Sequence, residues 1–309
     1  MTKKISKTIR YRGRFAPSPT GPLHFGSLVA AVGSYLEAKT HGGDWLVRIE
    51  DVDTPREVLG ASSDILSTLE HLGMNWDGDV IYQSQRGALY QEAIHSLTQL
   101  NLTYPCTCTR KEILDSSIIG IIGPIYPGTC RHAQDNHQPS ALRIQTDDKR
   151  LLFKDALQGC VVQRLESDTG DFVLRRADGV FAYQLAVVVD DAAQNITHVV
   201  RGEDLLDSTP RQIYLQQLLG YPVPKYMHLP VVTNRDGKKL SKQTLATPVD
   251  LSKAVPQLVA ASRFLGQTPP VELLKSDLSV FWQWALDNWQ LTRIPRCNHD
   301  FIDGSTQEK

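Results

Sequence analysis

The sequence predicts an α/β fold built on a parallel sheet, and three observations carry this prediction. A proline-rich turn at residues 14–22 runs almost directly into an apolar helical pattern at 27–39. A strand pattern at 45–49 follows and ends in acidic residues. Short β-branched segments then alternate with helical patterns further along the chain. This order is typical of parallel α/β sheets, in which ligands bind beyond the carboxyl ends of the strands.

Composition limits the classes of protein that fit. The chain has 309 residues, of which 41% are hydrophobic and 22% charged, as in a globular protein with one large or two small domains. Its apolar runs are too short to span a bilayer, and the basic segment 1–7 lacks the apolar stretch of a secretory signal, so we expect a cytoplasmic location. The net charge of −1 lacks the excess of a protein that grips nucleic acid through phosphates alone.

The turn and the helix after it predict a phosphate site. His24 and Gly26 stand at the start of the helix, where backbone N–H groups and the helix dipole favour anions. A second basic element, Lys239-Leu240-Ser241-Lys242, lies far downstream and could close over the same phosphates. The alternative for His24 is a histidine that merely caps the helix.

The remaining first-half elements follow from periodicity. Gly42 and Gly43 end the first helix, and the strand at 45–49 leads into Glu50, Asp51 and Asp53. Apolar residues at helical spacing predict two further helices, at 61–72 and 87–100.

Periodicity is lost from Cys106 to about Pro139, which predicts an inserted segment. Cys106, Cys108 and Cys130 cluster there, and in a cytosolic chain this clustering favours a metal over disulfides. Three thiols are one ligand short of tetrahedral zinc, and coordination chemistry alone would choose His132 or His137 as the fourth. One zinc ion would be structural, because the insertion is too small for its own core. The alternative is three buried free cysteines.

Beyond residue 140, strand patterns again alternate with helical patterns. The patterns predict strands at 141–145, 159–164, 196–200 and 228–232, a helix at 210–219, and a strand or buried helix at 180–190 that carries Tyr183. The tail from Leu251 reads as helical. Its tryptophans, Trp282, Trp284 and Trp289, are expected in a core rather than stacked on bases.

Several blocks together resemble a known family. In order they are RFAPSPTG at 14–21, HFGS at 24–27, RIEDVD at 48–53, QSQR at 83–86, VDD at 189–191, RGED at 201–204, TPRQ at 209–212 and KLSKQ at 239–243. This series is similar to the catalytic core of class I glutamyl-tRNA synthetases, with HFGS in place of their HIGH element and KLSKQ in place of their KMSKS loop.

The resemblance implies a Rossmann-like class I core with a zinc-binding insertion and a small C-terminal helical subdomain. We expect the first half of the catalytic domain at 1–105, the insertion at 106–140, the second half at 141–245 and the helical subdomain at 246–309. It also implies Tyr126 as the fourth zinc ligand, beside Cys106, Cys108 and Cys130.

The implied reaction is activation of L-glutamate by ATP with Mg²⁺, forming glutamyl-adenylate. The attacking carboxylate is already ionised, so the enzyme contributes positioning and electrostatic stabilisation rather than a general base. The resemblance assigns His24, Gly26 and Lys242 to catalysis, and Lys242 would neutralise the leaving pyrophosphate. The ATP-binding residues would be His24, Gly26, Lys239, Ser241 and Lys242.

Glutamate itself needs charged contacts. By the family pattern, Arg14 and Arg201 would hold its side-chain carboxylate, which suits a guanidinium fork, and Glu50 would hold its ammonium group. Tyr183 would hydrogen-bond the substrate, and the segment Arg14, Phe15, Ala16, Pro17 and Ser18 would line it. Asp51 and Asp53 are expected to be structural, holding arginines in place.

The acceptor expectation rests on the region after the KMSKS-like loop. A full glutamyl-tRNA synthetase has a long anticodon-binding region there, whereas only residues 243–309 follow Lys242. This resembles a shortened paralogue that attaches glutamate to queuosine within the anticodon of tRNA(Asp). Activation without tRNA, no membrane contact and a monomer are expected. The alternatives are a truncated synthetase that charges tRNA(Glu), and a non-catalytic module derived from a synthetase.

Overall fold

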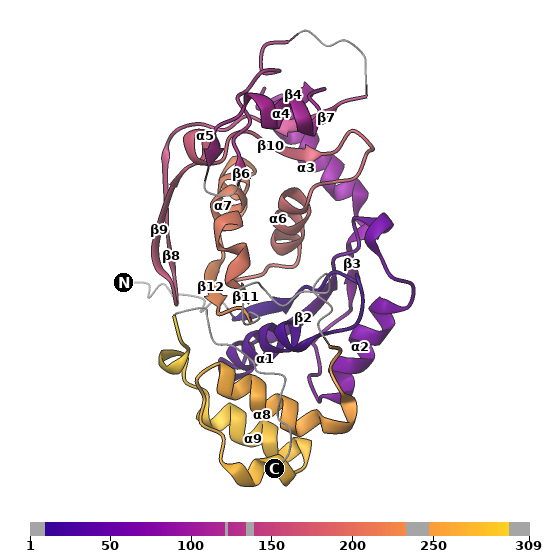
Figure 1. The fold of residues 1–309 in the computed structure, drawn as a ribbon, viewed down its shortest axis with the longest axis vertical. Helices are drawn as coiled ribbons and strands as arrows, with labels where there is room; N and C mark the ends of the chain where they lie inside the picture. Colours follow the sequence, from indigo (N-terminus) through magenta and orange to yellow (C-terminus); the bar gives the residue numbers. More distant parts are fainter. Residues whose placement is uncertain (1–9, 121–122, 134–138, 233–246, 297–309) are drawn as a thin grey trace, which may run out of the picture.

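We analysed a computed structural model of the chain. The structure describes residues 10–120, 123–133, 139–232 and 247–296. Figure 1 shows parallel strands at the middle of the molecule, a small antiparallel sheet at one end and the C-terminal helices at the other. Among the described residues, no helix is both long enough and apolar enough to cross a membrane.

The first half forms a parallel sheet. Its strands pair in the order β1 (Arg12–Phe15), β2 (Asp44–Ile49) and β3 (Ile81–Tyr82), and α1 (Phe25–Thr40) connects the first two. Helices α2 (Ala61–His71) and α3 (Gly87–Gln99) follow, close to their predicted ranges. The proline-rich turn begins later than predicted, because Arg14 and Phe15 still pair with β2 as part of β1.

The second half continues this architecture. Strand β11 (His198–Gly202) pairs in parallel with β12 (Lys225–Leu229), and the backbone N–H of Thr197 donates to Arg12 O (2.9 Å) beside β1. The predicted strand at 228–232 was shifted, because Pro230 has no N–H with which to extend the ladder. The uncertain segment at 180–190 is the helix α6 (Tyr183–Ala193), and α7 (Thr209–Leu218) lies within two residues of its predicted range.

A hairpin extends the β12 side of the sheet. Strand β8 (Arg150–Asp155) pairs in parallel with β12 at one position, Asp155 opposite Tyr226, and antiparallel with β9 (Gly159–Arg164). Strand β8 was not among the predicted elements, although its burial alternates strictly from residue to residue.

The inserted region is more regular than expected. Three antiparallel strands, β4 (Thr103–Cys106), β7 (Ala141–Ile144) and β10 (Phe172–Arg175), form its sheet. The segment between β4 and β7 contains α4 (Arg110–Ser116), which starts with a capping box between Thr109 and Glu112. The segment predicted as an insertion, 106–140, therefore contains a helix that the loss of apolar periodicity did not indicate. The remaining short elements are β5 (Ile119–Gly120), β6 (Gly123–Pro124) and α5 (Leu165–Asp168).

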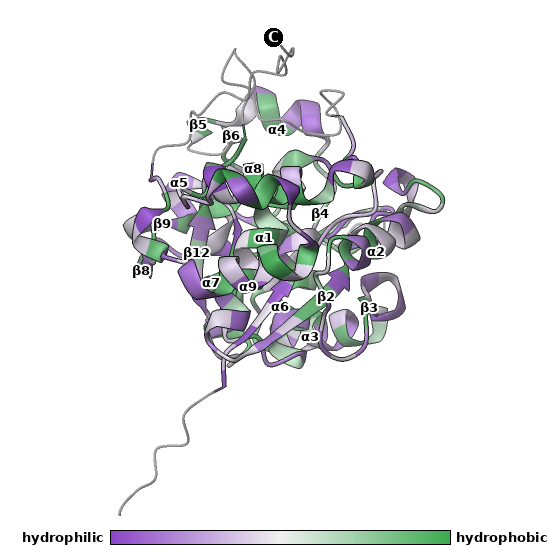
Figure 2. Ribbon diagram, turned by 90° about the horizontal axis from the view of Figure 1, so that it is seen from below, coloured by the Kyte–Doolittle hydropathy of each residue, from purple (hydrophilic) through white to green (hydrophobic). Residues whose placement is uncertain are grey.

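The C-terminal helices pack on α1. Figure 1 places α1 between the sheet and α8 (Ala254–Phe264), with α9 (Leu278–Asn288) beside α8, and Figure 2 shows apolar residues along α1 and α8. Trp282 is buried and donates from Nε1 to Leu72 O (2.7 Å), as a core tryptophan should. Trp284 and Trp289 are only partly buried but pack against the same core.

Candidate active site

A cavity of about 600 Å³ opens at the carboxyl ends of the parallel strands. Its walls come from the ends of β1, β2, β11 and β12, from the start of α1 and from the first residue of α6. Ten of the predicted site residues line it: Arg14, Phe15, Ala16, Pro17, Ser18, His24, Gly26, Glu50, Tyr183 and Arg201. The other three in the ATP set, Lys239, Ser241 and Lys242, lie outside the described residues.

His24 caps helix α1 and also lines the cavity. Its backbone is extended, and its Nδ1 accepts from the backbone N–H of Ser27 (3.4 Å), so the capping interpretation describes part of what this residue does. Gly26 lies in the first turn of α1 and lines the same wall. The N-terminus of a 16-residue helix therefore borders the cavity, which suits an anion.

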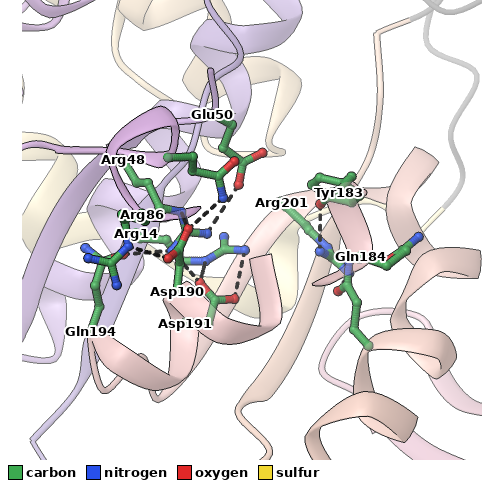
Figure 3. A network of polar contacts seen from close by, with 12 residues as sticks. Arg14, Arg48, Glu50, Arg86, Tyr183, Gln184, Asp190, Asp191, Gln194 and Arg201 are labelled. Atoms are coloured by element: carbon green, nitrogen blue, oxygen red, sulfur yellow. Dashed lines mark hydrogen bonds and ion pairs between the residues drawn. The ribbon is translucent and has the colours of Figure 1, made fainter. Parts of the chain in front are cut away.

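Glu50 follows directly after β2 and is held from two sides. Its backbone N–H donates to Pro17 O (3.0 Å), which ties the strand end to the proline-rich turn. Its Oε1 accepts from Nη2 of Arg48 (3.2 Å). Burial raises the pKa of Glu50, while Arg48 and Arg14 oppose this rise. The carboxylate thus lies among cations but at the cavity wall (Figure 3).

Asp191 on α6 joins two buried arginines. Its Oδ1 accepts from Nη1 of Arg48 (2.8 Å) and from Nε of Arg14 (3.1 Å), as Figure 3 shows. Burial alone would raise the pKa of Asp191, but Arg14 and Arg48 outweigh it and hold the pKa below its usual range. Because Arg14 commits one edge to Asp191, a ligand would meet its Nη1 side.

Asp190 likewise accepts hydrogen bonds from several side chains, and these come from α3 and the residues just before it. It accepts from Nε2 of Gln83 (2.8 Å), from the hydroxyl of Tyr90 (2.8 Å) and from Nε of Arg86. Both aspartates lie in the block VDD at 189–191, but no role was predicted for them. The signal was present, because two adjacent acids end a buried apolar run on α6 and buried acids require partners.

Arg201 ends β11 on the other side of the cavity. Its Nη1 donates to the hydroxyl of Tyr183 (3.3 Å), the first residue of α6, and Figure 3 shows the two side chains facing each other. Its Nε donates to Nε2 of His228 (3.1 Å), which sequence analysis had not considered. Burial raises the pKa of Tyr183, so its hydroxyl is a neutral donor.

The two acids after Glu50 differ. Asp53 pairs with Arg56 (2.7 Å) and Arg176 (3.4 Å), in agreement with the structural role predicted for it. Asp51 instead accepts from the backbone N–H (2.8 Å) and the hydroxyl (2.6 Å) of Ser84. The prediction that it holds an arginine was wrong, because the end of β3 brings Ser84 to it first.

Comparison with known proteins fits this geometry. The family model for the catalytic domain of class I tRNA synthetases (E and Q) matches residues 10–257. A curated glutamyl-Q tRNA(Asp) synthetase from Dechloromonas aromatica is 58% identical over 93% of this chain and 96% of its own length. One from Chromobacterium violaceum is 53% identical over 92% and 95%. The chain belongs to the glutamyl-Q tRNA(Asp) synthetases.

Solved structures agree with this membership. The glutamate-tRNA synthetase of Elizabethkingia anophelis superposes with a TM-score of 0.78 at 25% identity, over 95% of this chain and 68% of that one. A glutamate tRNA ligase from Elizabethkingia meningosepticum, solved in complex with its amino acid, gives 0.77 at 25% identity over 95% and 67%. The predicted class I α/β fold is confirmed, and the chain is a ligase of the aminoacyl-tRNA synthetase type.

A second cavity of about 670 Å³ adjoins the first in this synthetase. The two share Ser18, Glu50, Arg56 and Tyr183 as wall residues. Four arginines line the second cavity: Arg56, Arg110, Arg143 and Arg176. Three acids, Glu50, Asp53 and Asp178, line this cavity as well, so its arginines exceed its carboxylates by one charge, which favours an anionic ligand only weakly.

The cysteine cluster of the synthetase has the geometry of a metal site. The sulfur atoms of Cys106, Cys108 and Cys130 lie within 4.8 Å of one another. The hydroxyl of Tyr126 is 3.4 Å from Cys106 Sγ and 3.6 Å from Cys108 Sγ. In a tetrahedron with Zn–S bonds of about 2.3 Å and a Zn–O bond of about 2.0 Å, ligand atoms lie about 3.5–3.8 Å apart. These residues could hold a metal ion.

Of the described candidates for the fourth position, Tyr126 lies at the cluster and His132 does not. His132 is exposed, and the group of metal-ligating side chains found among the described residues does not include it. His137 lies outside the described residues. Tyr126 is buried, and the guanidinium of Arg143 lies over its ring (3.9 Å), which fixes the ring between the cluster and the second cavity.

Proposed function

We propose that this chain activates L-glutamate with ATP, without tRNA, and then transfers the glutamyl group to queuosine in the anticodon of tRNA(Asp). One observation carries the first half. A carboxylate, Glu50, and two arginines, Arg14 and Arg201, line the same cavity as the N-terminus of α1. Glutamate carries two carboxylates and one ammonium group, and these side chains complement its charges.

The residues suggest how the first step proceeds. An oxygen of the substrate α-carboxylate attacks the α-phosphorus of ATP, and pyrophosphate leaves with its electron pair. Glu50 would hold the ammonium group, and Arg14 and Arg201 the side-chain carboxylate. His24 and the first N–H groups of α1 would face the phosphates, where negative charge grows in the transition state.

The residues that flank the basic segment Lys239–Lys242 in the chain support this step. Lys239, Ser241 and Lys242 lie outside the described residues, but Val232 before them lines the cavity and Pro248 after them forms a β-bridge with His24. The described residues on both sides of segment 233–246 therefore lie at the site. In our proposal Lys242 neutralises the pyrophosphate, which carries Mg²⁺ from ATP.

The second cavity supports the transfer step. A hydroxyl of the acceptor would attack the glutamyl carbonyl, and AMP would leave. An acceptor nucleoside in the second cavity would reach that carbonyl past Glu50 and Tyr183, which both cavities share. The four arginines would meet the flanking phosphates. The names of the curated relatives support queuosine in tRNA(Asp) as the acceptor.

Pyrophosphate exchange tests the activation half. We expect glutamate-dependent exchange between ATP and labelled pyrophosphate with no tRNA present. Strict dependence on tRNA would contradict tRNA-independent activation, and no exchange under any condition would favour the non-catalytic module. Charging of tRNA(Glu) at its 3′ end would favour the truncated synthetase.

Zinc is our second proposal for this chain. Three thiolates and one phenol oxygen form a donor set that suits Zn²⁺, which would be structural because it would join β4, through Cys106, to the segment that carries Tyr126 and Cys130. With it we propose the four-part division at 1–105, 106–140, 141–245 and 246–309. The substrates place the activity in the cytoplasm, and a monomer stays a prediction.

A further inference from the structure

Three buried polar residues extend from the β8 end to the wall of the first cavity. Asp155, His228 and Arg201 are 1%, 0% and 6% exposed. The register of the sheet places them together, because His228 on β12 pairs with Arg201 on β11 and Asp155 on β8 pairs with Tyr226, two residues before His228. Residues two apart on a strand share a face of the sheet.

The hydrogen bonds run in one direction. Nε of Arg201 donates to Nε2 of His228 (3.1 Å), and Nδ1 of His228 lies 2.6 Å from Oδ2 of Asp155. A guanidinium has no acceptor, so Nε2 of His228 must offer its lone pair to Arg201, and the hydroxyl of Thr209, 3.1 Å from the same nitrogen, can also donate to it. The imidazole is therefore neutral with its hydrogen on Nδ1, bonded to Asp155. Burial lowers the pKa of His228 to about 4, which agrees with a neutral ring.

The carboxylate of Asp155 is itself fixed. Its Oδ1 accepts from the backbone N–H groups of Leu157 and Gln158 (both 2.9 Å), in the turn between β8 and β9. The hairpin therefore fixes the orientation of this carboxylate independently of its bond to His228. Gln158 in the same turn donates from Nε2 to His228 O (2.9 Å) and to Oε2 of Glu203 (3.2 Å).

All three nitrogens of the Arg201 guanidinium have hydrogen-bond partners. Nη2 donates to Oγ1 of Thr209 (2.9 Å) and Oε1 of Gln212 (2.8 Å), while Nε donates to His228. Nη1 remains on the side of Tyr183, a wall residue of the cavity. The orientation of the whole group therefore determines where Nη1 points.

We propose that Asp155 and His228 are positioning residues for glutamate recognition. Asp155 fixes the Nδ1–H tautomer of His228, and the unprotonated Nε2 holds Arg201 so that Nη1 faces the substrate carboxylate. This inference rests on the proposed activation of glutamate. It adds a role for the β8–β9 hairpin, which lines no part of the first cavity.

Nitrogen-15 NMR of the full-length protein tests the tautomer without any assay of activity. We expect the His228 ring, assigned by comparison with His228→Gln, to show protonated Nδ1 and unprotonated Nε2 at neutral pH. Protonated Nε2, or an imidazolium, would overturn the proposal. In Asp155→Asn the neutral amide can donate to Nδ1, so we expect the opposite tautomer to gain population.

Glutamate kinetics test the consequence with a matched pair. The amide of His228→Asn reaches the position of Nδ1 and leaves Arg201 without its acceptor, whereas the oxygen of His228→Gln reaches the position of Nε2. We expect KM for glutamate in pyrophosphate exchange to rise about tenfold or more in His228→Asn, less in His228→Gln, with KM for ATP unchanged.

A control and two outcomes complete the test. Asp171→Asn removes an equally buried carboxylate that touches neither cavity wall and should leave KM for glutamate unchanged. Equal KM values for glutamate in His228→Asn and His228→Gln, with both variants folded by thermal melting, would overturn the positioning role. Absence of exchange in the wild-type protein would instead contradict the proposed function, and the NMR result would still decide the tautomer.

Discussion

At the residue scale, Glu50 is subject to two opposing effects, a need for charge and burial. It must stay ionised to hold an ammonium group, yet it is buried at the end of β2, and burial raises its pKa. Arg48 and Arg14 oppose this effect. In our proposal Arg14 binds substrate, and with Arg48, its neighbour on Asp191, it also favours the ionised form of Glu50.

Removing the charge of Glu50 should selectively weaken the binding of glutamate. Glu50→Gln keeps the shape and an oxygen that can accept from Arg48, but it loses the attraction for the ammonium group. We expect KM for glutamate to rise roughly tenfold to a hundredfold in pyrophosphate exchange. Glu57→Gln, an exposed neighbour that lines neither cavity, is the control. An unchanged KM in Glu50→Gln would contradict the assignment.

A substitution at Arg110 tests the transfer step separately from the activation step. It begins α4, is exposed, and lines only the second cavity. Arg110→Ala should lower the rate of transfer to tRNA about threefold to tenfold, as expected for one phosphate contact, with unchanged pyrophosphate exchange. Arg150→Ala, an exposed arginine on β8, should change neither. A loss of exchange in Arg110→Ala would argue against a separate acceptor cavity.

Residues with a motif around them could be predicted, and their partners could not. Arg14, Glu50 and Arg201 lie in blocks that carry the family resemblance, and all three line one cavity. The partner of Arg14 lies 177 residues away at Asp191, and that of His228 lies 73 residues away at Asp155. A single sequence contains no sign of such pairs, because only the fold brings them together.

Local rules explain which elements could be predicted. Helices α1, α2 and α3 have apolar residues at helical spacing and were found within two residues of their observed ends. Helix α4 was missed because it is short and has no buried residue to give a periodic pattern. The sequence signal that remained was its capping box, Thr109 with Glu112.

The metal cluster should hold the inserted region together. We expect native mass spectrometry to show one zinc ion per chain, lost in Cys106→Ser together with a lower melting temperature. Cys160→Ser on β9 changes an exposed cysteine outside the cluster and should retain both properties. Metal-free protein with unchanged melting in a chelator would contradict a structural zinc site.

At the scale of the whole molecule, stability should fall with acid through a partly buried histidine, His198. Burial, with help from Lys225 and His41, lowers the pKa of His198 to about 4. The unfolded chain binds this proton below about pH 6.5, so the stability that His198 contributes is present above that pH and is lost toward pH 4.

A variant separates the contribution of His198 to the pH dependence of stability from that of the other titrating groups. His198→Gln should lose about 1 kcal/mol less free energy of unfolding than the wild-type protein between pH 7 and pH 4, after a discount for the partial exposure of the ring. Urea denaturation at both pH values measures the difference. Parallel losses in the two proteins would show that His198 titrates normally.

The distribution of charge over the molecule connects the fold to the acceptor. The net charge is only −1, yet four arginines gather in the cavity next to the glutamate site. Composition alone could not have predicted this gathering, because the four arginines, Arg56, Arg110, Arg143 and Arg176, come from positions spread over 120 residues of the chain. An anionic ligand is thus weakly favoured at one place and not over the whole surface.

Transfer to tRNA(Asp) with and without queuosine tests the central claim most directly. Radiolabelled glutamate, ATP and this protein are incubated with the two forms of tRNA(Asp) and with tRNA(Glu). We predict that label enters only the queuosine-containing tRNA(Asp), and that it still does so when the 3′-terminal adenosine of that tRNA has been removed. Equal labelling of both forms of tRNA(Asp), or labelling of tRNA(Glu) at its 3′ end, would contradict the account.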